Sequence, residues 1–399
     1  MNSKITIGLI ITYFGLSQLP PFFLLMKGVY FTQINFTGII FLNLIASILG
    51  LCLIKTTLNF KGLSYCLLIS NLIVGFNLMI HENFLNEWVH FSYPISLMFI
   101  SVVFQNLIGK DKIQYLSIYI LCVFCLTVLI HIIFGLQRGY LKYGFFDKCF
   151  VNTGQYASYL MMFFPTLLAF AVFEKNKSKR DFIIRIICGF ASLLILGIAF
   201  LNNARTCWIA SIIVILVYIG LSKNVHKGLK IKSIITFIVI AILLFGLAYF
   251  LKKDSADGRI LIYKLSFKMF MDNPFLGVGF NCFEAHYNLY QADYFQKYND
   301  SRAAWLADDI SVAYNEIIQS LAELGVSAVI IWAIISKQIV RRLHILFEKN
   351  AVVAWGNAGF IGFIIVSLCA CLFSYPLSII EITNALFMNI LFLTMINKE

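Results

Sequence analysis

The chain has 399 residues, of which 60% are hydrophobic and only 13% are charged. An ordinary soluble domain is about 25% charged, and the surface of a soluble 45.5 kDa protein needs more polar side chains than this chain supplies. The composition therefore excludes a soluble globule and indicates a protein whose solvent is the lipid bilayer. In a soluble protein, the net charge of +12 would suggest a nucleic-acid partner, so the distribution of that charge has to be considered.

Twelve apolar segments are long enough for a helix to cross a hydrocarbon core, which takes about 17 to 25 residues. They lie at 5–26, 36–54, 62–80, 92–108, 113–136, 154–173, 182–201, 205–221, 232–250, 311–336, 352–373 and 376–396. The sequence therefore predicts an all-α integral membrane protein with about twelve transmembrane helices, forming a single polytopic domain over residues 1–399. Its one large connection, residues 251–310, lies between the ninth and tenth helices.

Basic residues gather on one side of the predicted spans. With the N-terminus inside the cell, the inner connections carry nineteen of the 31 lysines and arginines, and the short outer connections carry five. This is the positive-inside distribution, so the charge reports membrane topology and predicts no nucleic-acid partner. Both termini are predicted to be cytoplasmic, and residues 251–310 are predicted to face the periplasm or cell exterior.

The first span and the cysteines have ordinary interpretations. The first apolar segment is too long for a signal-peptide core and ends without a small-residue cleavage site, so we expect it to be retained. Most of the ten cysteines lie inside predicted spans, and the pair Cys122 and Cys125 has no nearby ligand residues. We therefore expect neither a zinc site nor a disulfide.

Two polar segments open predicted spans on the outer side. Asn152 to Gln155 begin the sixth span, where helix capping explains them about as well as function does. Arg205 begins the eighth span, where the helix dipole opposes a cation. A bound anion such as a phosphate would resolve that conflict, because a guanidinium can hold two oxygens at once. The alternative is an arginine that snorkels to the membrane interface.

The outer connection 251–310 opens with a predicted amphipathic helix. Ile260, Tyr263, Phe267 and Phe270 fall on one helical face, which indicates a helix lying in the membrane interface. Arg259, at the start of this helix, allows the same two interpretations as Arg205. Two arginines on one side of the membrane could together hold a diphosphate.

The same connection contains twelve aromatic residues. Aromatic faces with nearby carboxylates suit sugar rings, whose C–H faces stack while their hydroxyls form hydrogen bonds. The alternative is that these side chains pack the connection onto the membrane surface, since aromatic residues favour interfaces. His286 is a candidate base, although a lone histidine is more often simply solvated.

A polar stripe follows in the predicted tenth span. Glu316, Gln319 and Glu323 fall at helical spacings that put them on one face. Polar groups inside a membrane helix are costly, so such a stripe is either functional or structurally paired.

Three strings in this chain resemble motifs of one family. They are Asn203 to Trp208, Gly258 to Tyr263 followed by Asp272 to Phe280, and Tyr314 to Gly325. In this order, and with twelve helices and a large outer connection after the ninth, the sequence resembles the O-antigen ligase and O-antigen polymerase superfamily. Each string is weak alone, and their order and topology make the resemblance fairly specific.

The resemblance implies a glycosyltransferase of the bacterial cytoplasmic membrane that acts at its outer face. It would move a glycan from an undecaprenyl-diphosphate donor to a hydroxyl of an acceptor glycan or glycolipid, without a metal, nucleotide or other cofactor. Arg205 and Arg259 match the positions that hold the donor diphosphate, and we predict that they are catalytic together with Tyr314 and Glu316. The predicted substrate-binding residues are Asn152, Gln155, His286, Asn315, Gln319 and Glu323.

One departure from the family pattern bears on the type of transferase. Many ligases have a histidine just before the Asn-Glu pair, and this chain has Tyr314 there. A phenol with a pKa near 10 is a poor base at neutral pH, which favours a polymerase slightly over a ligase.

The alternative function is a polytopic transporter or flippase of lipid-linked glycans. Such proteins often divide into two six-span halves. Here the link between spans six and seven is short and the long connection follows span nine, which argues against a transporter.

Overall fold

The computed structural model describes residues 3–17, 40, 42–49, 51, 63–82, 84–107, 110–137, 150, 153–175, 178–221, 253–298, 301–348 and 354–396. All regular structure in these ranges is helical, with no strand, which confirms the all-α prediction. The ninth predicted span (232–250) and Asn152 lie outside the described residues.

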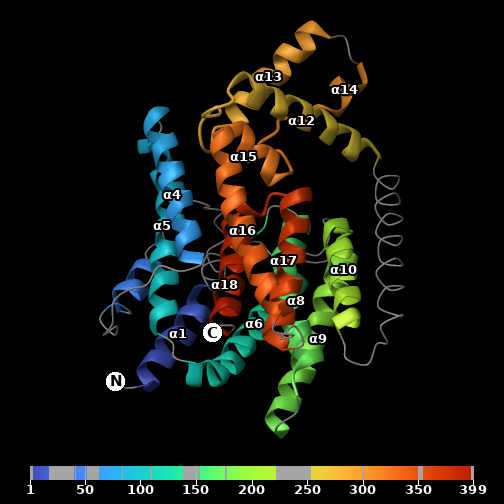
Figure 1. The fold of residues 1–399 in the computed structure, drawn as a ribbon. Helices are drawn as coiled ribbons and strands as arrows, with labels where there is room; N and C mark the ends of the chain where they lie inside the picture. The colour runs from blue at the N-terminus through green and yellow to red at the C-terminus, as the bar shows by residue number, and fades with distance from the viewer. Residues whose placement is uncertain are drawn as a thin grey trace.

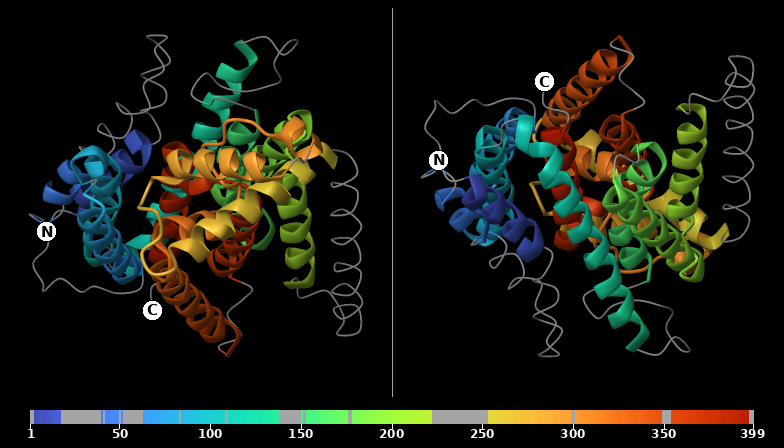
Figure 2. Two further views of the ribbon diagram at one scale, coloured as in Figure 1. Left: turned by 90° about the horizontal axis from the view of Figure 1, so that it is seen from above. Right: turned by 90° about the horizontal axis from the view of Figure 1, so that it is seen from below.

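Most helices run side by side in a bundle, and three lie across one end of it as a cap (Figure 1). The bundle consists of α1 (Ser3–Ser17), α4 (Leu63–Ile80), α5 (Phe84–Leu107), α6 (Lys110–Gln137), α7 (Thr153–Met161), α8 (Phe164–Phe173), α9 (Lys179–Leu201), α10 (Arg205–Leu221), α16 (Val326–Glu348), α17 (Trp355–Phe373) and α18 (Ile380–Ile396). The cap consists of α12 (Lys253–Asp272), α13 (Phe283–Lys297) and α14 (Ser301–Leu306), and the short α15 (Glu316–Leu324) joins it to the bundle. Figure 2, seen from above, shows the yellow and orange cap helices over the bundle.

Among the residues that the structure describes, five helical segments are long and apolar enough to cross a membrane. They are Leu63–Ile80, Leu116–Ile133, Thr153–Phe173, Lys179–Leu201 and Trp355–Phe373, and shorter apolar helices lie at Ile7–Ser17, Phe91–Asn106, Arg205–Leu221 and Ile380–Ile396. Each coincides with a predicted span or lies inside one, to within a few residues. The full number of twelve transmembrane helices stays a prediction.

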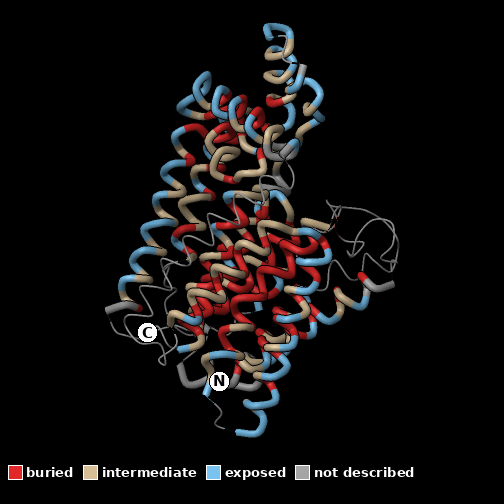
Figure 3. The backbone as a smooth tube through the Cα atoms, turned by 90° about the vertical axis from the view of Figure 1, so that its right-hand side faces the viewer, coloured by how far each residue is buried: buried red, intermediate tan, exposed pale blue. Residues whose placement is uncertain are grey.

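The outward faces of these helices suit lipid. Four apolar side chains of α9 are each more than half exposed: Phe182, Ile186, Phe190 and Leu193. Soluble proteins rarely expose apolar patches of such extent to water. Figure 3 shows the buried residues gathered along the bundle axis and exposed ones on its outside. The exposed apolar faces therefore support a bilayer as the surrounding solvent.

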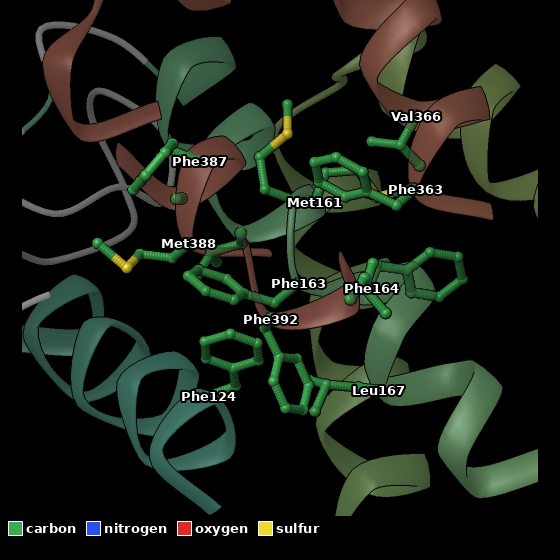
Figure 4. Packing of buried hydrophobic residues seen from close by; sticks show 14 of the residues in the cluster. Phe124, Met161, Phe163, Phe164, Leu167, Phe363, Val366, Phe387, Met388 and Phe392 are labelled. Carbon is green, nitrogen blue, oxygen red and sulfur yellow. The ribbon is translucent and has the colours of Figure 1, made fainter. Parts of the chain in front are cut away.

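Aromatic side chains fill the middle of the bundle. Phe124 of α6, Phe163 and Phe392 of α18 are fully or almost fully buried, and their ring centroids lie 5.0 Å (Phe124 to Phe163) and 5.5 Å (Phe124 to Phe392) apart (Figure 4). Tilted and edge-on ring pairs at such distances are favourable beyond simple burial. This core fixes α6, α7, α8 and α18 under the cap.

The cap has a hydrophobic core of its own. Leu265 and Met269 of α12 are buried against Phe283 and Tyr287 of α13, whose rings stack with centroids 5.4 Å apart. The predicted interfacial helix exists as α12, but its predicted apolar face is divided. Ile260 and Phe267 are exposed, whereas Tyr263 packs toward the cap core.

The predicted tenth span (311–336) is not one continuous helix. Residues 311–315 are irregular, and Gly325 separates α15 from α16 with a left-handed φ of +62°. A Cβ at Gly325 would collide with the backbone of Pro274 and Phe275, and the Val326 N–H donates to the Pro274 carbonyl at 2.7 Å. The turn that follows α12 therefore packs directly against the break between α15 and α16.

This turn also joins the cap to α4. The Asn77 side chain donates to the Leu276 carbonyl at 2.7 Å and accepts from the Phe280 N–H at 2.9 Å. The Gly279 N–H donates to the Glu323 carbonyl at 3.0 Å. The second family-like string, Asp272 to Phe280, thus forms a turn that binds the cap to both α4 and α15.

Candidate active site

Arg205 lies at the cap end of the bundle because a tight turn connects α9 to α10. Asn203 adopts a left-handed φ of +50°, a conformation that asparagine adopts more readily than most residues. The Ala204 N–H then donates to the Ala199 carbonyl at 3.0 Å. Arg205 is therefore the first residue of α10 and half-buried, at the helix end where the dipole opposes a cation.

Arg259 reaches the same end of the bundle from the cap. Its Nη1 donates to the Phe373 carbonyl at 3.0 Å, at the last residue of α17, where the helix dipole favours a cation. Its guanidinium carbon lies 4.8 Å from the centroid of the Tyr314 ring, in the range of a cation–π contact. Together these contacts hold the guanidinium between the cap and the bundle.

The two arginines are electrostatic neighbours. Their positive charges lie close enough to repel each other, although the residues are far apart in the sequence and come from the bundle and the cap. Guanidinium groups pair well with phosphate oxygens, often through two parallel hydrogen bonds. An anion bound between Arg205 and Arg259 would relieve the repulsion.

Tyr314 forms the aromatic wall of this site. Its φ is +54°, an unusual conformation for a bulky residue. Its ring packs edge to face against Tyr375 with centroids 5.2 Å apart, and its carbonyl accepts from the Tyr263 hydroxyl at 3.4 Å. Burial raises the pKa of Tyr314 above its ordinary value, nearby Tyr375 raises it further, and Arg259 opposes the shift.

Sequence reasoning missed Tyr375. It lies between α17 and the short η2 helix (Pro376–Ser378), and its hydroxyl accepts from Gln155 Nε2 at 3.1 Å. Gln155, a predicted substrate-binding residue, is thus linked to Tyr314 through Tyr375. The available signal was a Tyr-Pro pair in the short connection between the last two predicted spans.

Asn315 and Glu316 attach α15 to the end of the bundle. The Asn315 side chain caps α15 by accepting from Ile317 N–H and Ile318 N–H, both at 3.0 Å, and its Nδ2 donates to the Leu372 carbonyl at 3.0 Å. Glu316 is buried and its Oε1 accepts from the Leu377 N–H at 2.7 Å. These contacts fix the α17–α18 connection beside Tyr314.

Gln319 and Glu323 continue the predicted polar face of α15. Gln319 accepts from the Ala313 N–H at 3.1 Å and donates to Glu323 Oε1 at 3.2 Å. Glu323 is buried, and its Oε2 accepts from the Asn281 N–H at 3.2 Å. The face therefore makes contacts within the protein, and direct substrate contacts from its residues stay a prediction.

The remaining predicted residues add less to this geometry. His286 lies on α13 with Nδ1 3.1 Å from the carbonyl oxygen of Cys282, the residue just before that helix, and Asn152 is outside the described residues. Within the described ranges, no group of three or more His, Cys, Asp or Glu side chains is arranged to hold a metal ion.

A cavity of about 430 Å³ opens beside Arg259 and Tyr314. It lies within the cap, where Tyr287 of α13 and Trp305 of α14 contribute to its lining together with Asp308. Its volume is in the range of small-molecule binding sites. Sequence reasoning did not locate it, because its lining comes from three helices and the segment before α15.

Comparison with known protein families gives one match. Residues 190–333 match the family model described as O-antigen ligase, a range that runs from α9 into α16 and contains Arg205, the cap, Arg259 and α15. The match confirms the resemblance to the O-antigen ligase and polymerase superfamily and supports a membrane glycosyltransferase. It implies lipid-linked glycan and acceptor substrates, and nothing favours the transporter alternative. A comparison with curated proteins finds no match.

Proposed function

We propose that the protein transfers a glycan from an undecaprenyl-diphosphate donor to a hydroxyl of an acceptor glycan or glycolipid. The observation that carries this proposal is that Arg205, at the start of α10, and Arg259, held to the end of α17, bring two like charges within electrostatic reach at the junction of bundle and cap. Two half-buried guanidinium groups of like charge at one place favour the binding of an anion, and a membrane-bound diphosphate is such an anion.

In the proposed reaction, the acceptor oxygen bonds to the anomeric carbon of the donor sugar. The bond from that carbon to the diphosphate oxygen breaks, its electron pair leaves with the diphosphate, and the hydroxyl proton is released. Arg205 and Arg259 stabilise the charge that develops on the diphosphate, and fixed cations in a partly dehydrated site are effective at this. Tyr314 supports Arg259 through its ring.

The site is proposed to lie at the outer face of the bacterial cytoplasmic membrane, with both termini in the cytoplasm. Lys179 and Arg180 stand at the start of α9, and Arg341 and Arg342 lie near the end of α16. Both positions are at helix ends opposite the cap (Figure 1). Under the positive-inside rule, this distribution supports a cytoplasmic placement for that end.

Within this function, a polymerase is slightly favoured over a ligase. Tyr314 stands where many ligases of the family have a histidine, and the shift of its pKa above the ordinary value leaves even less phenolate available to act as a base near neutral pH. Deleting the gene in the source bacterium tests the choice. Loss of a polymerase leaves single repeats on the lipid anchor, whereas loss of a ligase leaves polymer that is not attached.

Substituting lysine for each arginine tests the diphosphate site. Arg205→Lys and Arg259→Lys keep the charge but lose the planar two-point fork, so we expect product formation to fall by on the order of a hundred- to a thousandfold. The measurement is surface polysaccharide in a deletion strain complemented with each variant at matched protein level. Arg180→Lys, exposed at the opposite end of the bundle, is the control. Near-normal product from both site variants would refute the assignment.

A further inference from the structure

The cavity in the cap begins at the proposed diphosphate site and leads away from it. Arg259 and Tyr314 line it at the junction with the bundle, and Asp254 and Trp305 line it within the cap. A ligand whose diphosphate lies at Arg259 would therefore place its adjoining groups in or beside this cavity.

The walls of the cavity combine rigid aromatic rings with hydrogen-bonding groups. Tyr287 is fully buried and its hydroxyl donates to Gln291 Oε1 at 3.2 Å. Gln291 Nε2 in turn donates to the Asp308 carbonyl at 3.1 Å, so α13 is fixed to the segment before α15. These two hydrogen bonds hold the backbone at Asp308 beside Tyr287.

Trp305 is held at the cavity although it packs little against the protein. Trp305 is 74% exposed, which is unusual for tryptophan, the largest aromatic residue. The helix that carries it is fixed to α12 by Arg302, which pairs with Asp257 at 2.7 Å and with Asp254 at 3.4 Å. The fold therefore presents an indole ring at the cavity and leaves much of it uncovered.

Other aromatic residues of the cap have partners in the protein. Lys264 lies 4.9 Å from the Tyr294 ring centroid, and Lys268 lies 5.5 Å from that of Tyr290. These rings stabilise the packing of α12 against α13. Trp305 differs from them in combining high exposure with a place in the lining of the cavity.

We propose that the cavity binds one sugar ring of a substrate glycan, with the C–H face of the sugar on Trp305 and its hydroxyls toward Asp254 and Asp308. An aromatic face beside carboxylates matches a pyranose, which is apolar on its faces and carries hydroxyls around its edge. The proposal rests on the proposed function, because Arg259 lines both the cavity and the diphosphate site. The ring comes from the donor, next to its diphosphate, or from the acceptor.

Binding measurements with three probes test this proposal without turnover. The full-length protein in lipid nanodiscs is titrated with undecaprenyl diphosphate and with the same lipid carrying one repeat unit. It is then titrated with the free repeat-unit oligosaccharide from the source organism's polysaccharide, in the presence of saturating undecaprenyl diphosphate. The variants are Trp305→Ala and Trp305→Phe, with Leu289→Ala as the control because Leu289 is exposed on α13 and outside the cavity lining.

For a donor ring, Trp305→Ala should reduce the preference for the sugar-bearing lipid over the bare lipid by about tenfold or more, as expected for removal of a tryptophan anchor. If the cavity binds a ring of the acceptor, Trp305→Ala should keep the preference for the sugar-bearing lipid but bind the free oligosaccharide about tenfold or more weakly. In either case, Trp305→Phe should keep most of the wild-type affinity for the sugar-bearing probe, and Leu289→Ala should keep all of it.

Unchanged binding of both sugar-bearing probes by Trp305→Ala would overturn the sugar site. The bare lipid separates this result from a failure of the proposed function. Arg259→Lys should weaken the binding of undecaprenyl diphosphate, and if it does not, the diphosphate site is wrong whatever Trp305 does.

Discussion

Tyr314 shows how a single residue can be held in an unfavourable conformation at a site. A left-handed backbone costs a bulky residue on the order of 1–3 kcal/mol and persists only where its surroundings hold it. Here Arg259 contacts the ring on one side and Tyr375 on another. The strained backbone directs the ring toward the guanidinium, which points to a positioning role.

We expect Tyr314→Phe to retain activity within about threefold and Tyr314→Ala to lose most of it. Phenylalanine keeps the ring, and a cation–π contact is worth about 0.5–2 kcal/mol. Because the pKa of Tyr314 is shifted upward, the phenol stays protonated below its ordinary pKa near 10, so its titration cannot shape the rate between pH 6 and 9. Rate against pH for wild type and Tyr314→Phe should therefore have the same form. A limb of the profile that disappears in Tyr314→Phe would show that the hydroxyl transfers a proton.

The arginines illustrate what can be predicted at the residue scale. Arg205 is the first residue of α10, as the sequence predicts, so it could be singled out from the conflict between its cation and the helix dipole. The prediction that Arg259 starts its helix is wrong, because α12 begins at Lys253 and Arg259 lies past its first turn. The contact from Arg259 to Phe373 joins residues 114 positions apart. A link of that length depends on how the cap lies on the bundle, which no local pattern encodes.

At the scale of elements, α15 is a connector between the cap and the bundle. It packs against α12, while Asn315 and Glu316 bind the end of α17 and the start of η2. Its polar face could be predicted from the sequence, because helical spacing alone puts Glu316 and Glu323 on one side. The break at Gly325 could not be predicted, because it depends on the close approach of Pro274, which lies in a turn distant in the sequence.

Removing the Glu316 carboxyl group should destabilise this connector. We expect Glu316→Ala to lower the free energy of unfolding by about 0.5–1.5 kcal/mol, the usual value of a hydrogen bond, because the Leu377 N–H loses its acceptor. Glu316→Gln keeps an acceptor oxygen and should lose less. The measurement is the thermal unfolding midpoint of the detergent-purified protein.

Glu284→Ala is the control for that experiment, because Glu284 is exposed on α13. If Glu316→Ala and Glu284→Ala unfold at the same temperature, the contact with η2 does not hold the connector in place.

At the scale of the molecule, the sequence predicted a membrane protein with a large connection, and the structure shows that connection folded as a helical cap. The apolar helices of the described residues lie within a few residues of predicted spans, because apolar length alone indicates them, whereas the predicted tenth span is broken at Gly325. The packing of the cap could not be, because Tyr287, Trp305 and Asp308 meet only through tertiary contacts. The cavity is therefore a property of the assembled cap.

Accessibility labelling tests the orientation of the whole molecule. A single cysteine added at Asn288, on α13, should react with a membrane-impermeant maleimide in intact spheroplasts above the wild-type background. One added at Lys179, at the other end of the bundle, should react only after permeabilisation. The reverse result would place Arg205 and Arg259 in the cytoplasm, away from any donor on the outer face.

The clamp of Asn77 on the turn after α12 also sets an order of events during synthesis. Asn77 and Leu276 are 199 positions apart, and ribosomes add about 5–20 residues per second. By that rate, α4 is made about 10–40 s before the turn that it holds. The α4–α5 pair must therefore enter the membrane and wait there for its partner, so the cap can be seated only late in biogenesis. A stall after α5 and before Arg259 would leave only the N-terminal part of the bundle, without α16, α17 and α18 and without the arginine from the cap.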